Sequence, residues 1–178
     1  MKYPGGTHRG IEMVLAYLSG PIIHANKRRN DFYRFVFSTL EELEIEVFAP
    51  QFLPPASAEE IYRRDVHNVR SCDLLIAEVS NASHGVGMEI MLAIELNKPV
   101  LLFHHSSGEK LSRMVLGADG KVLFMYDELK EVSRRLLGTD LKKLTVANCS
   151  KCESQVAEKI DNEVRCVACG SLASRKKG

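Results

Sequence analysis

Residues 72–99, CDLLIAEVSNASHGVGMEIMLAIELNKP, are the stretch that decides the fold. The segment from Asp73 to Val79 is an apolar run closed by polar residues, which is typical of a strand buried on both faces of a parallel sheet. Small and turn-forming residues follow, and Met88 to Leu96 then places apolar residues at helical spacing. This order predicts a strand, a glycine-bearing loop and a helix. Such a loop lies where open α/β sheets bind ligands and where free helix amides attract anions, so Glu89 is expected to face a ligand.

The chain on either side repeats this alternation of strand and helix. Further buried strands are predicted at residues 12–18, 46–49, 99–103 and 122–126, and further helices at about residues 30–43, 58–71, 110–116 and 127–137. Asn30 or Asp31 is the expected cap of the first of these helices. Ile61, Val66 and Val69 are expected to face inward on the second. Residues 50–55 contain three prolines, which predicts an irregular segment that could form a lid.

This order of elements predicts a flavodoxin-like three-layer α/β sandwich around a five-stranded parallel sheet. Alternating strands and helices favour right-handed crossovers and place helices on both faces of the sheet. The strand order 2-1-3-4-5 fits best, and it puts the Ser19–Gly20 loop and the loop from Ser83 to Glu89 on either side of the switch point. The two loops would therefore frame one pocket.

Length and charge limit the number of domains and the kinds of partner. The chain has 178 residues, of which 45% are hydrophobic, so it can bury one well-packed domain and a small appendage. Its 24 basic and 23 acidic residues leave a net charge of +1, so no overall field attracts nucleic acid or an anionic membrane. No apolar run reaches the length of a membrane span and the first residues lack the layout of a signal peptide, which makes the cytoplasm the expected location.

Four of the five cysteines form two CxxC pairs near the C-terminus. Cys149 and Cys152 are separated by 13 residues from Cys166 and Cys169, a spacing typical of a four-thiolate metal site. Zinc is favoured over iron because nothing indicates electron transfer, and disulfide pairs are the alternative. Cys72 is expected to be a small core residue. The pattern predicts four segments: a flexible leader (1–10), the α/β domain (11–143), a zinc ribbon (144–173) and a basic tail (174–178).

Several side chains that could do chemistry converge on the predicted pocket. They are Tyr17 at a strand end, Asp65 on a helix, Ser83, the amides of Gly85 and Gly87, and Glu89. Two carboxylates beside a loop that favours phosphate suggest glycosyl chemistry on a nucleotide, in which one acid attacks or stabilises the anomeric carbon and the other handles protons at the leaving base. Each carboxylate also has a structural explanation, because Glu89 could serve the helix dipole and Asp65 a solvated ion pair. Tyr17 could equally be a core residue.

Five motifs, in order, resemble those of the nucleoside 2-deoxyribosyltransferase superfamily. They are YLSGPI (17–22), YRRDV (62–66), CDLLIAEV (72–79), SHGVGME (83–89) and LSRM (111–114). The resemblance covers about residues 13–137 and is closest to the 2'-deoxynucleoside 5'-monophosphate N-glycosidases. The SxGVGxE element with an upstream RD on a helix carries most of its specificity.

The resemblance implies a flavodoxin-like homodimer that works through a covalent intermediate. Glu89 would attack C1' of the sugar, Asp65 would assist departure of the base, and Tyr17 would orient the glutamate and the sugar. The substrate would be contacted by Ser19, Gly20, Ser83, Gly85, Gly87, Ser112 and Met114. Water resolves the intermediate in the hydrolases, whereas a second base does so in the transferases.

The 5' end of the substrate separates these two branches. In the monophosphate hydrolases, serines at the positions of Ser83 and Ser112 hold the phosphate, and the resemblance implies that Ser112 reaches in from the partner subunit. Transferases tend to carry asparagine at the position of Ser112, so this serine favours nucleotide hydrolysis. Pro21 and Ile23 replace a serine and an arginine of the animal hydrolases, which argues in the other direction. The lost cation could be replaced by His24, Lys27, Arg28 or Arg29.

The favoured function is hydrolysis of the N-glycosidic bond of (2'-deoxy)nucleoside 5'-monophosphates, with zinc only in a structural role. The nearest alternative is a deoxyribosyltransferase that exchanges bases between deoxynucleosides. A non-catalytic protein that senses nucleotides or binds nucleic acid is a different class of answer, and intact Tyr17, Asp65 and Glu89 argue against it. The expected partners are a nucleotide or nucleoside and a second copy of the chain; a membrane is not expected, and contact of the ribbon and its tail with nucleic acid is the less favoured interpretation.

Overall fold

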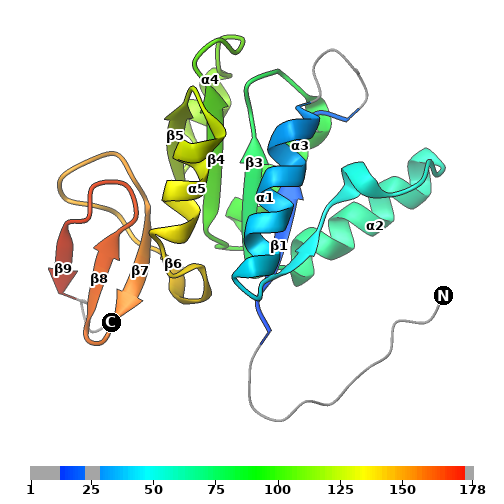
Figure 1. Cartoon of the computed structure of the whole chain (residues 1–178). Coiled ribbons are helices and arrows are strands. Elements are labelled where there is room, and N and C mark those ends of the chain that lie inside the picture. The colour runs from blue at the N-terminus through cyan, green and yellow to red at the C-terminus, as the bar shows by residue number, and fades with distance from the viewer. Residues whose placement is uncertain (1–12, 23–28, 175–178) are drawn as a thin grey trace.

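The computed structural model describes residues 13–22 and 29–174, and its larger part is built on a parallel sheet (Figure 1). The strands of this sheet are β1 (Leu15–Ser19), β2 (Glu46–Phe48), β3 (Leu74–Glu78), β4 (Val100–His105) and β5 (Lys121–Tyr126). Within the described ranges they form a five-stranded sheet with the order β2-β1-β3-β4-β5, and every pair is parallel. The predicted fold class and strand order are confirmed.

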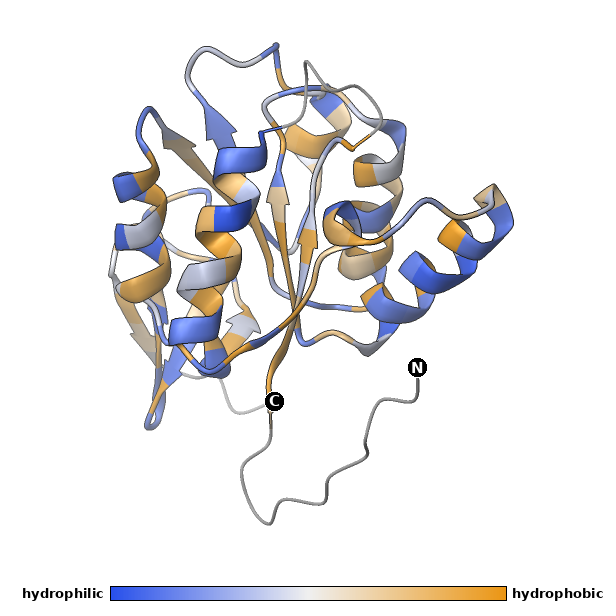
Figure 2. Ribbon diagram, turned by 45° about the vertical axis from the view of Figure 1, so that its right-hand side comes forward, coloured by the Kyte–Doolittle hydropathy of each residue, from blue (hydrophilic) through white to orange (hydrophobic). Residues whose placement is uncertain are grey.

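Helices cover both faces of this sheet, which gives the three layers. Helices α1 (Asn30–Glu42) and α5 (Leu129–Leu137) pack on one face, and α2 (Ala58–Ser71) and α3 (His84–Glu95) pack on the other. Successive side chains of a strand point to opposite faces, so Ile76 joins the α1/α5 core while its neighbours Leu75 and Ala77 join the α2/α3 core. Figure 2 shows the resulting apolar interior and the polar outer surfaces of the helices.

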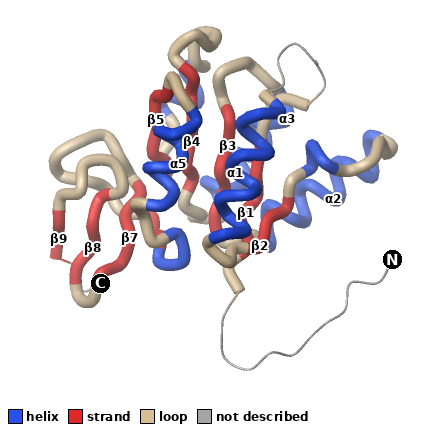
Figure 3. The backbone as a smooth tube through the Cα atoms, viewed as in Figure 1, coloured by secondary structure: helices blue, strands red, loops and turns tan. Residues whose placement is uncertain are grey.

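A second, antiparallel sheet lies beside β5 and α5 (Figure 3). Its strands are β6 (Leu144–Val146), β7 (Val156–Ile160), β8 (Glu163–Cys166) and β9 (Leu172–Ser174), and the short 3-10 helix Leu141–Lys143 precedes them. Val156 and Val167 are buried in the same apolar cluster as Phe124 and Leu136 of the α/β part. The two sheets therefore share one core.

The structure corrects three local predictions. Residues 50–55 are not wholly irregular, because Pro50–Phe52 forms a 3-10 helix with proline at its first position, where a missing amide costs nothing. Ile61 is 39% exposed rather than inward, since the N-terminal half of α2 projects from the body while Val69 is fully buried (Figure 1). Neither Asn30 nor Asp31 caps α1; the N-cap is Arg29, and its side chain makes no capping hydrogen bond.

The remaining differences concern element boundaries. Helix α4 (Arg113–Gly117) begins three residues later than predicted, and Ser19 ends β1 instead of opening a loop. The predicted leader, Ile23, His24, Lys27, Arg28 and residues 175–178 of the basic tail lie outside the described residues. No helix in the described part of the chain is long and apolar enough to cross a membrane.

Candidate active site

Glu89 lies on α3, which starts at the carboxyl end of β3. The helix begins at His84 with Ser83 as its N-cap, so Glu89 is in the second turn rather than the first. The helix dipole acts on charges mainly within the first turn. The dipole therefore does not explain this carboxylate, and its own contacts have to.

Both oxygens of Glu89 accept a hydrogen bond from β1. The Tyr17 hydroxyl donates to Oε1 at 2.9 Å, and the Ser19 hydroxyl donates to Oε2 in a close contact. Tyr17 and Ser19 are two positions apart on a strand, so their side chains leave the same face of the sheet. The strand thus supplies two hydroxyl donors that fix the carboxylate from one side. The sequence assigned Ser19 to the substrate, whereas the structure places it on Glu89.

Asp65 is brought to the same place by α2. It is 9% exposed, and Arg64 Nε donates to its Oδ1 at 2.7 Å. The Arg64 guanidinium also lies over the Phe48 ring at 6.0 Å, and the Phe48 ring centroid is 5.4 Å from that of Tyr17. Asp65 does form an ion pair, as the structural alternative proposed, but the pair is largely buried and not solvated at the aspartate. Arg64 is a site residue that the sequence analysis did not single out, because burial of its partner has no local sequence signal.

The surroundings of Glu89 have opposing effects on its pKa. The pKa of Glu89 is raised to about 7, chiefly by burial and to a lesser extent by the charge of Asp65, against the hydrogen bonds from Ser19 and Tyr17 and the charge of Arg64, which lower it. The pKa of Tyr17 is raised by burial first and then by the charges of Glu89 and Asp65, so its hydroxyl stays protonated and remains a donor. A carboxylate that is partly desolvated and aligned by hydroxyl donors suits nucleophilic attack.

The start of α3 leaves open space beside Glu89. Gly85 is four residues before Glu89 and therefore lies on the same line of the helix, one turn closer to its N-terminus. No described atom lies within 4 Å of a Cβ placed on Gly85 or on Gly87. The amide of Gly87 donates to the Ser83 carbonyl at 3.1 Å, so of the two predicted amides only that of Gly85 is left for a ligand by the helix geometry.

Gly20 has a packing reason of its own. A Cβ at this position would collide with the Tyr33 ring of α1, so the close approach of β1 and α1 requires glycine. The Tyr33 hydroxyl donates to the Pro21 carbonyl at 3.4 Å, which ties the buried start of this loop to the helix. The structure therefore explains Gly20 without a ligand, and its predicted contact with substrate stays a prediction.

Ser112 and Met114 lie on a different surface. A groove of about 740 Å³ runs between α3 and residues 109–118, and both Ser83 and Ser112 line it with mostly apolar neighbours. Met114 is 82% exposed at its edge. Glu89 does not line this groove. Together with Gly85 and Ala93 it forms the stripe of α3 that faces away from the groove. Within one chain, Ser112 and Glu89 therefore lie on different faces of α3.

Glu78 is a second buried acid, and it is not part of this site. It is wholly buried at the end of β3, where its Oε1 accepts from Ser80 and from the Tyr126 hydroxyl at 3.3 Å. Burial raises the pKa of Glu78. Its side chain follows the parity of Ile76 and points to the α1 face of the sheet, opposite to Tyr17.

The four paired cysteines come together in the second sheet. Their sulfur atoms, from Cys149, Cys152, Cys166 and Cys169, all lie within 4.8 Å of one another. None of the five cysteines of the chain, all of which are described, forms a disulfide, so the alternative of disulfide pairs is not found. The Ser171 hydroxyl lies 3.1 Å from the sulfur of Cys149 and 3.2 Å from that of Cys169. A compact all-thiol donor set fits a structural metal ion.

Comparisons with known proteins agree with this geometry. The sequence profile of the family described as nucleoside 2-deoxyribosyltransferase matches residues 16–162. The 5-hydroxymethyl-dUMP N-hydrolase of Danio rerio is 43% identical over 72 residues, which cover 40% of this chain and 50% of that protein. The enzyme of the same name from Mus musculus is 40% identical over 79 residues, which cover 43% of this chain and 46% of that protein. The chain spans about half the length of these curated relatives.

Solved structures show the same fold. The CMP N-glycosidase of Clostridium botulinum matches with a TM-score of 0.52 at 21% identity, over 68% of this chain and 97% of that protein. The 2-desoxiribosyltransferase of Leishmania mexicana matches with a TM-score of 0.53 at 18% identity, over 72% of this chain and 99% of that protein. At such identities the likeness concerns the arrangement of the elements.

Proposed function

The chain belongs to the nucleoside 2-deoxyribosyltransferase family, and on that premise we propose that it hydrolyses the N-glycosidic bond of (2'-deoxy)nucleoside 5'-monophosphates to free base and (deoxy)ribose 5-phosphate. The observation that carries this proposal is the position of Glu89, whose two oxygens are held by Tyr17 and Ser19 with Asp65 nearby. The relatives from Danio rerio and Mus musculus, which are named as N-hydrolases of a nucleotide, support the same reaction.

The two carboxylates divide the work between attack and proton transfer. Glu89, ionised, attacks C1' of the sugar; the bond between C1' and the base nitrogen breaks and the base leaves with its electron pair. The departing base takes up a proton from Asp65, which is left as a carboxylate. A water molecule then attacks C1' of the glycosyl ester and loses its proton to Asp65, the ester bond breaks, and Glu89 returns as a carboxylate. Tyr17 keeps the nucleophile oriented through both steps.

The 5'-phosphate is assigned to the start of α3. Gly85 presents an amide without an intrahelical acceptor, and Ser83 precedes it as the N-cap. Both lie one to two turns from Glu89, which is the separation expected between the 5' end and C1' of one sugar. We therefore assign Ser83 and Gly85 to the phosphate, and we leave Gly87 out because its amide is already occupied.

Release of free base from a nucleotide tests the reaction. Purified full-length protein is incubated with CMP, dCMP, dGMP and 5-hydroxymethyl-dUMP, and with the corresponding nucleosides, and free base is separated by liquid chromatography. We expect base release from at least one monophosphate without any acceptor base. Mass spectrometry of quenched reactions should find a sugar phosphate on the peptide that contains Glu89.

The control for this assay is a matched pair of variants. Glu89→Gln should lower base release by about a thousandfold or more, because an amide is a poor nucleophile. Glu42→Gln, at an exposed position at the end of α1, should leave base release unchanged. Near-normal turnover by Glu89→Gln would reject Glu89 as the nucleophile.

Base exchange is the second candidate function, and the description of the matching family favours it. A transferase would use the same Glu89 ester but resolve it with a second base. Adding a free base in excess to the assay separates the two reactions: a new nucleoside or nucleotide indicates transfer, and turnover that needs the added base would replace hydrolysis as the function.

We propose that the active unit is a homodimer in which Ser112 serves the partner's site. The apolar groove supports this, because Met88, Met91 and Met114, which line it, are 59%, 51% and 82% exposed. Mixing two weakened variants, Glu89→Gln and Ser112→Ala, should restore about a quarter of wild-type activity, since half of randomly formed dimers are mixed and each mixed dimer holds one intact site. No recovery on mixing would place Ser112 and Glu89 in the same subunit's site.

We also propose zinc as the metal of the four-cysteine site and the cytoplasm as the location. Thiolate ligands from two CxxC turns suit zinc, which would tie the two turns together and supply folding free energy. Elemental analysis of protein purified without added metal should find about one zinc per chain. Iron in its place, with the absorption of an iron–sulfur centre, would contradict the assignment.

A further inference from the structure

Gln155, the residue just before β7, makes three hydrogen bonds to the segment that leads into β5. Gln155 Nε2 donates to Asp119 Oδ1 at 3.1 Å, and Gln155 Oε1 accepts a close hydrogen bond from the Gly120 amide. The Gln155 amide itself donates to the Lys121 carbonyl at 2.9 Å. Three consecutive residues of the α/β part are thus held by one residue of the ribbon (residues 144–173).

The turn at Gly120 depends on this contact. Gly120 is buried with a φ of +67°, in the left-handed region, and it lies between Ile94 of α3 and Val146 of β6. Its amide donates to Gln155 Oε1 in a part-buried hydrogen bond. Without Gln155 Oε1, the buried amide would lose its acceptor.

The held segment directly follows α4, which has little anchoring of its own. None of the five residues of α4 is buried, and Val115 is the member that packs partly against the core. Ser112 precedes this helix and Ala118 follows it, and both line the groove beside α3. The position of α4 is therefore set largely by its two ends, and Gln155 holds the second of them.

The other side of the contact is tied to the metal site. Gln155 comes three residues after Cys152, and its carbonyl accepts from the Ala147 amide at 3.0 Å. The Cys149 amide donates to the Ser154 carbonyl at 2.9 Å, so the first cysteine turn folds directly onto the residue before Gln155. A metal ion that closes the cysteine turns would also fix Gln155.

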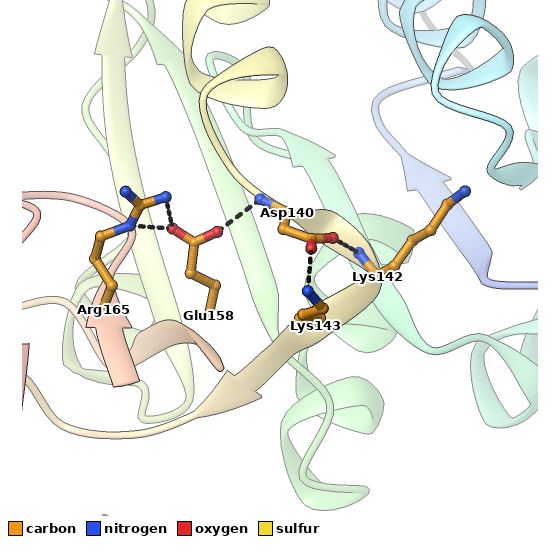
Figure 4. A network of polar contacts seen from close by, with 5 residues as sticks. All are labelled: Asp140, Lys142, Lys143, Glu158 and Arg165. Atoms are coloured by element: carbon orange, nitrogen blue, oxygen red, sulfur yellow. Dashed lines mark hydrogen bonds and ion pairs between the residues drawn. The ribbon is translucent and has the colours of Figure 1, made fainter. Parts of the chain in front are cut away.

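A separate polar network anchors the far end of the ribbon (Figure 4). Buried Glu158 of β7 accepts from the Asp140 amide at 2.7 Å through one oxygen and from Arg165 of β8 through the other. This network joins the ribbon to the chain after α5, whereas the hydrogen bonds of Gln155 join it to residues 119–121. Loss of Gln155 should therefore loosen α4 without detaching the ribbon.

We propose that the ribbon positions the α4 segment (residues 112–118) through Gln155, so that metal binding at the four cysteines supports nucleotide affinity at the site that Ser112 completes. Gln155 is a positioning residue, since it touches neither substrate nor reacting atoms. The link to nucleotide affinity rests on the proposed function, whereas the link between metal, Gln155 and α4 does not.

Hydrogen exchange and binding test the proposal on the full chain. Gln155→Ala removes the two side-chain hydrogen bonds, to Asp119 and Gly120, and keeps the backbone one to Lys121. With zinc still bound, amide exchange in residues 112–121 should speed up by at least about fivefold, the change expected when a single hydrogen bond is lost. Calorimetric affinity for the best monophosphate substrate, measured in the Glu89→Gln background, should fall by a similar factor, and KM should rise while kcat changes less than about twofold. Lys159→Ala, exposed on the same strand region, is the matched control and should change none of these.

Chelation supplies the second arm. Removing zinc from the otherwise normal protein should speed exchange in residues 112–121 as well, and by less when Gln155 is already alanine. Unchanged exchange in Gln155→Ala with full zinc content overturns the proposal, and so does faster exchange with unchanged nucleotide affinity. If no nucleotide is hydrolysed by any form, the proposed function fails, while the exchange measurements still decide whether Gln155 couples the metal site to α4.

Discussion

Glu89 is held where burial makes its ionisation unfavourable, and where we propose that the ionised form is the nucleophile. Its pKa is raised from 4.5 to about 7, because burial outweighs the lowering effect of two hydroxyl donors. For an acid with a raised folded pKa, stability is full below the unfolded value and falls as the pH rises through the folded one. The fold is therefore expected to lose stability between about pH 4.5 and pH 7 in exchange for a reactive carboxylate.

Replacing this charge should stabilise the protein while abolishing activity. We expect Glu89→Gln to raise the free energy of unfolding at pH 8 by about 1–3 kcal/mol, because the ionisation cost over the range from 4.5 to about 7 disappears. Near pH 4 the variant and the wild type should be equally stable. Urea unfolding at both pH values measures the difference, with Glu42→Gln as the control. Equal destabilisation at both pH values would mean that Glu89 acts mainly through packing.

Arg64 is expected to set the pH at which Glu89 becomes active. Its charge lowers the pKa of Glu89, so its removal should move the acidic limb of the kcat/KM profile to higher pH. We expect this shift in Arg64→Gln and only a small one in Arg64→Lys, which keeps the charge. Arg63, which pairs with exposed Glu59 at 2.7 Å, supplies the control Arg63→Gln. Identical profiles for the Arg63 and Arg64 variants would contradict this assignment.

Helix α3 separates two functions by its faces. The stripe of Gly85, Glu89 and Ala93 faces β1 and the candidate active site, and the rest of its surface lines the apolar groove. Helix α2 contributes differently, because its N-terminal half projects from the body while Asp65 and Val69 are buried (Figure 1). Asp65 thus sits where the helix first meets the sheet.

The projecting end of α2 depends on its capping box. The Ser57 hydroxyl accepts from the Glu60 amide at 3.2 Å, and the Glu60 carboxylate accepts from the Ser57 amide at 2.9 Å. Ser57→Ala should therefore cost about 0.5–2 kcal/mol of unfolding free energy. Because Asp65 is fixed separately by burial and Arg64, kcat should stay within about twofold of the wild type.

A serine at the other end of the same helix controls for this change. The Ser71 hydroxyl donates to the His67 carbonyl at 3.0 Å on an exposed turn, so Ser71→Ala should cost less than Ser57→Ala in chemical denaturation. A larger cost for Ser71→Ala would show that the capping box contributes little to α2.

On the scale of the whole molecule, the ribbon and the α/β part are one folding unit. Val156 and Val167 fill the same core as Phe124 and Leu136, and Glu158 and Gln155 make polar contacts across the junction. We expect a ribbon with so few apolar residues of its own to rely on a bound metal to fold. Loss of the metal should therefore expose part of the main core.

Metal removal is expected to lower the melting temperature of the entire protein. We expect a drop of at least about 5 °C on chelation, and a similar drop for Cys149→Ser, with far- and near-ultraviolet circular dichroism reporting one shared transition. Cys72→Ala is the control for loss of a cysteine outside the metal site. Two transitions, with the α/β part melting as before, would show that the ribbon is an independent domain.

The sequence by itself determined the alternation of strands and helices, the family motifs and the two CxxC pairs, because each of these is a local pattern. Apolar runs near Leu75 and helical spacing after Met88 are short-range signals that each element carries alone. The two CxxC pairs are equally local. The same kind of signal failed at Ile61, where periodicity indicated an inward face but no neighbouring element was there to cover it.

Only the tertiary structure decided which side chains are in contact and how far they are shielded from solvent. Tyr17 and Glu89 are 72 residues apart in the chain, and Gln155 reaches Gly120 across 35. Burial turned the neighbours Arg64 and Asp65 from an ordinary surface pair into part of the site. Desolvation and hydrogen bonding are set by what packs around a group, and sequence spacing does not record that. The folded arrangement therefore chose between the structural and the chemical interpretation of each residue.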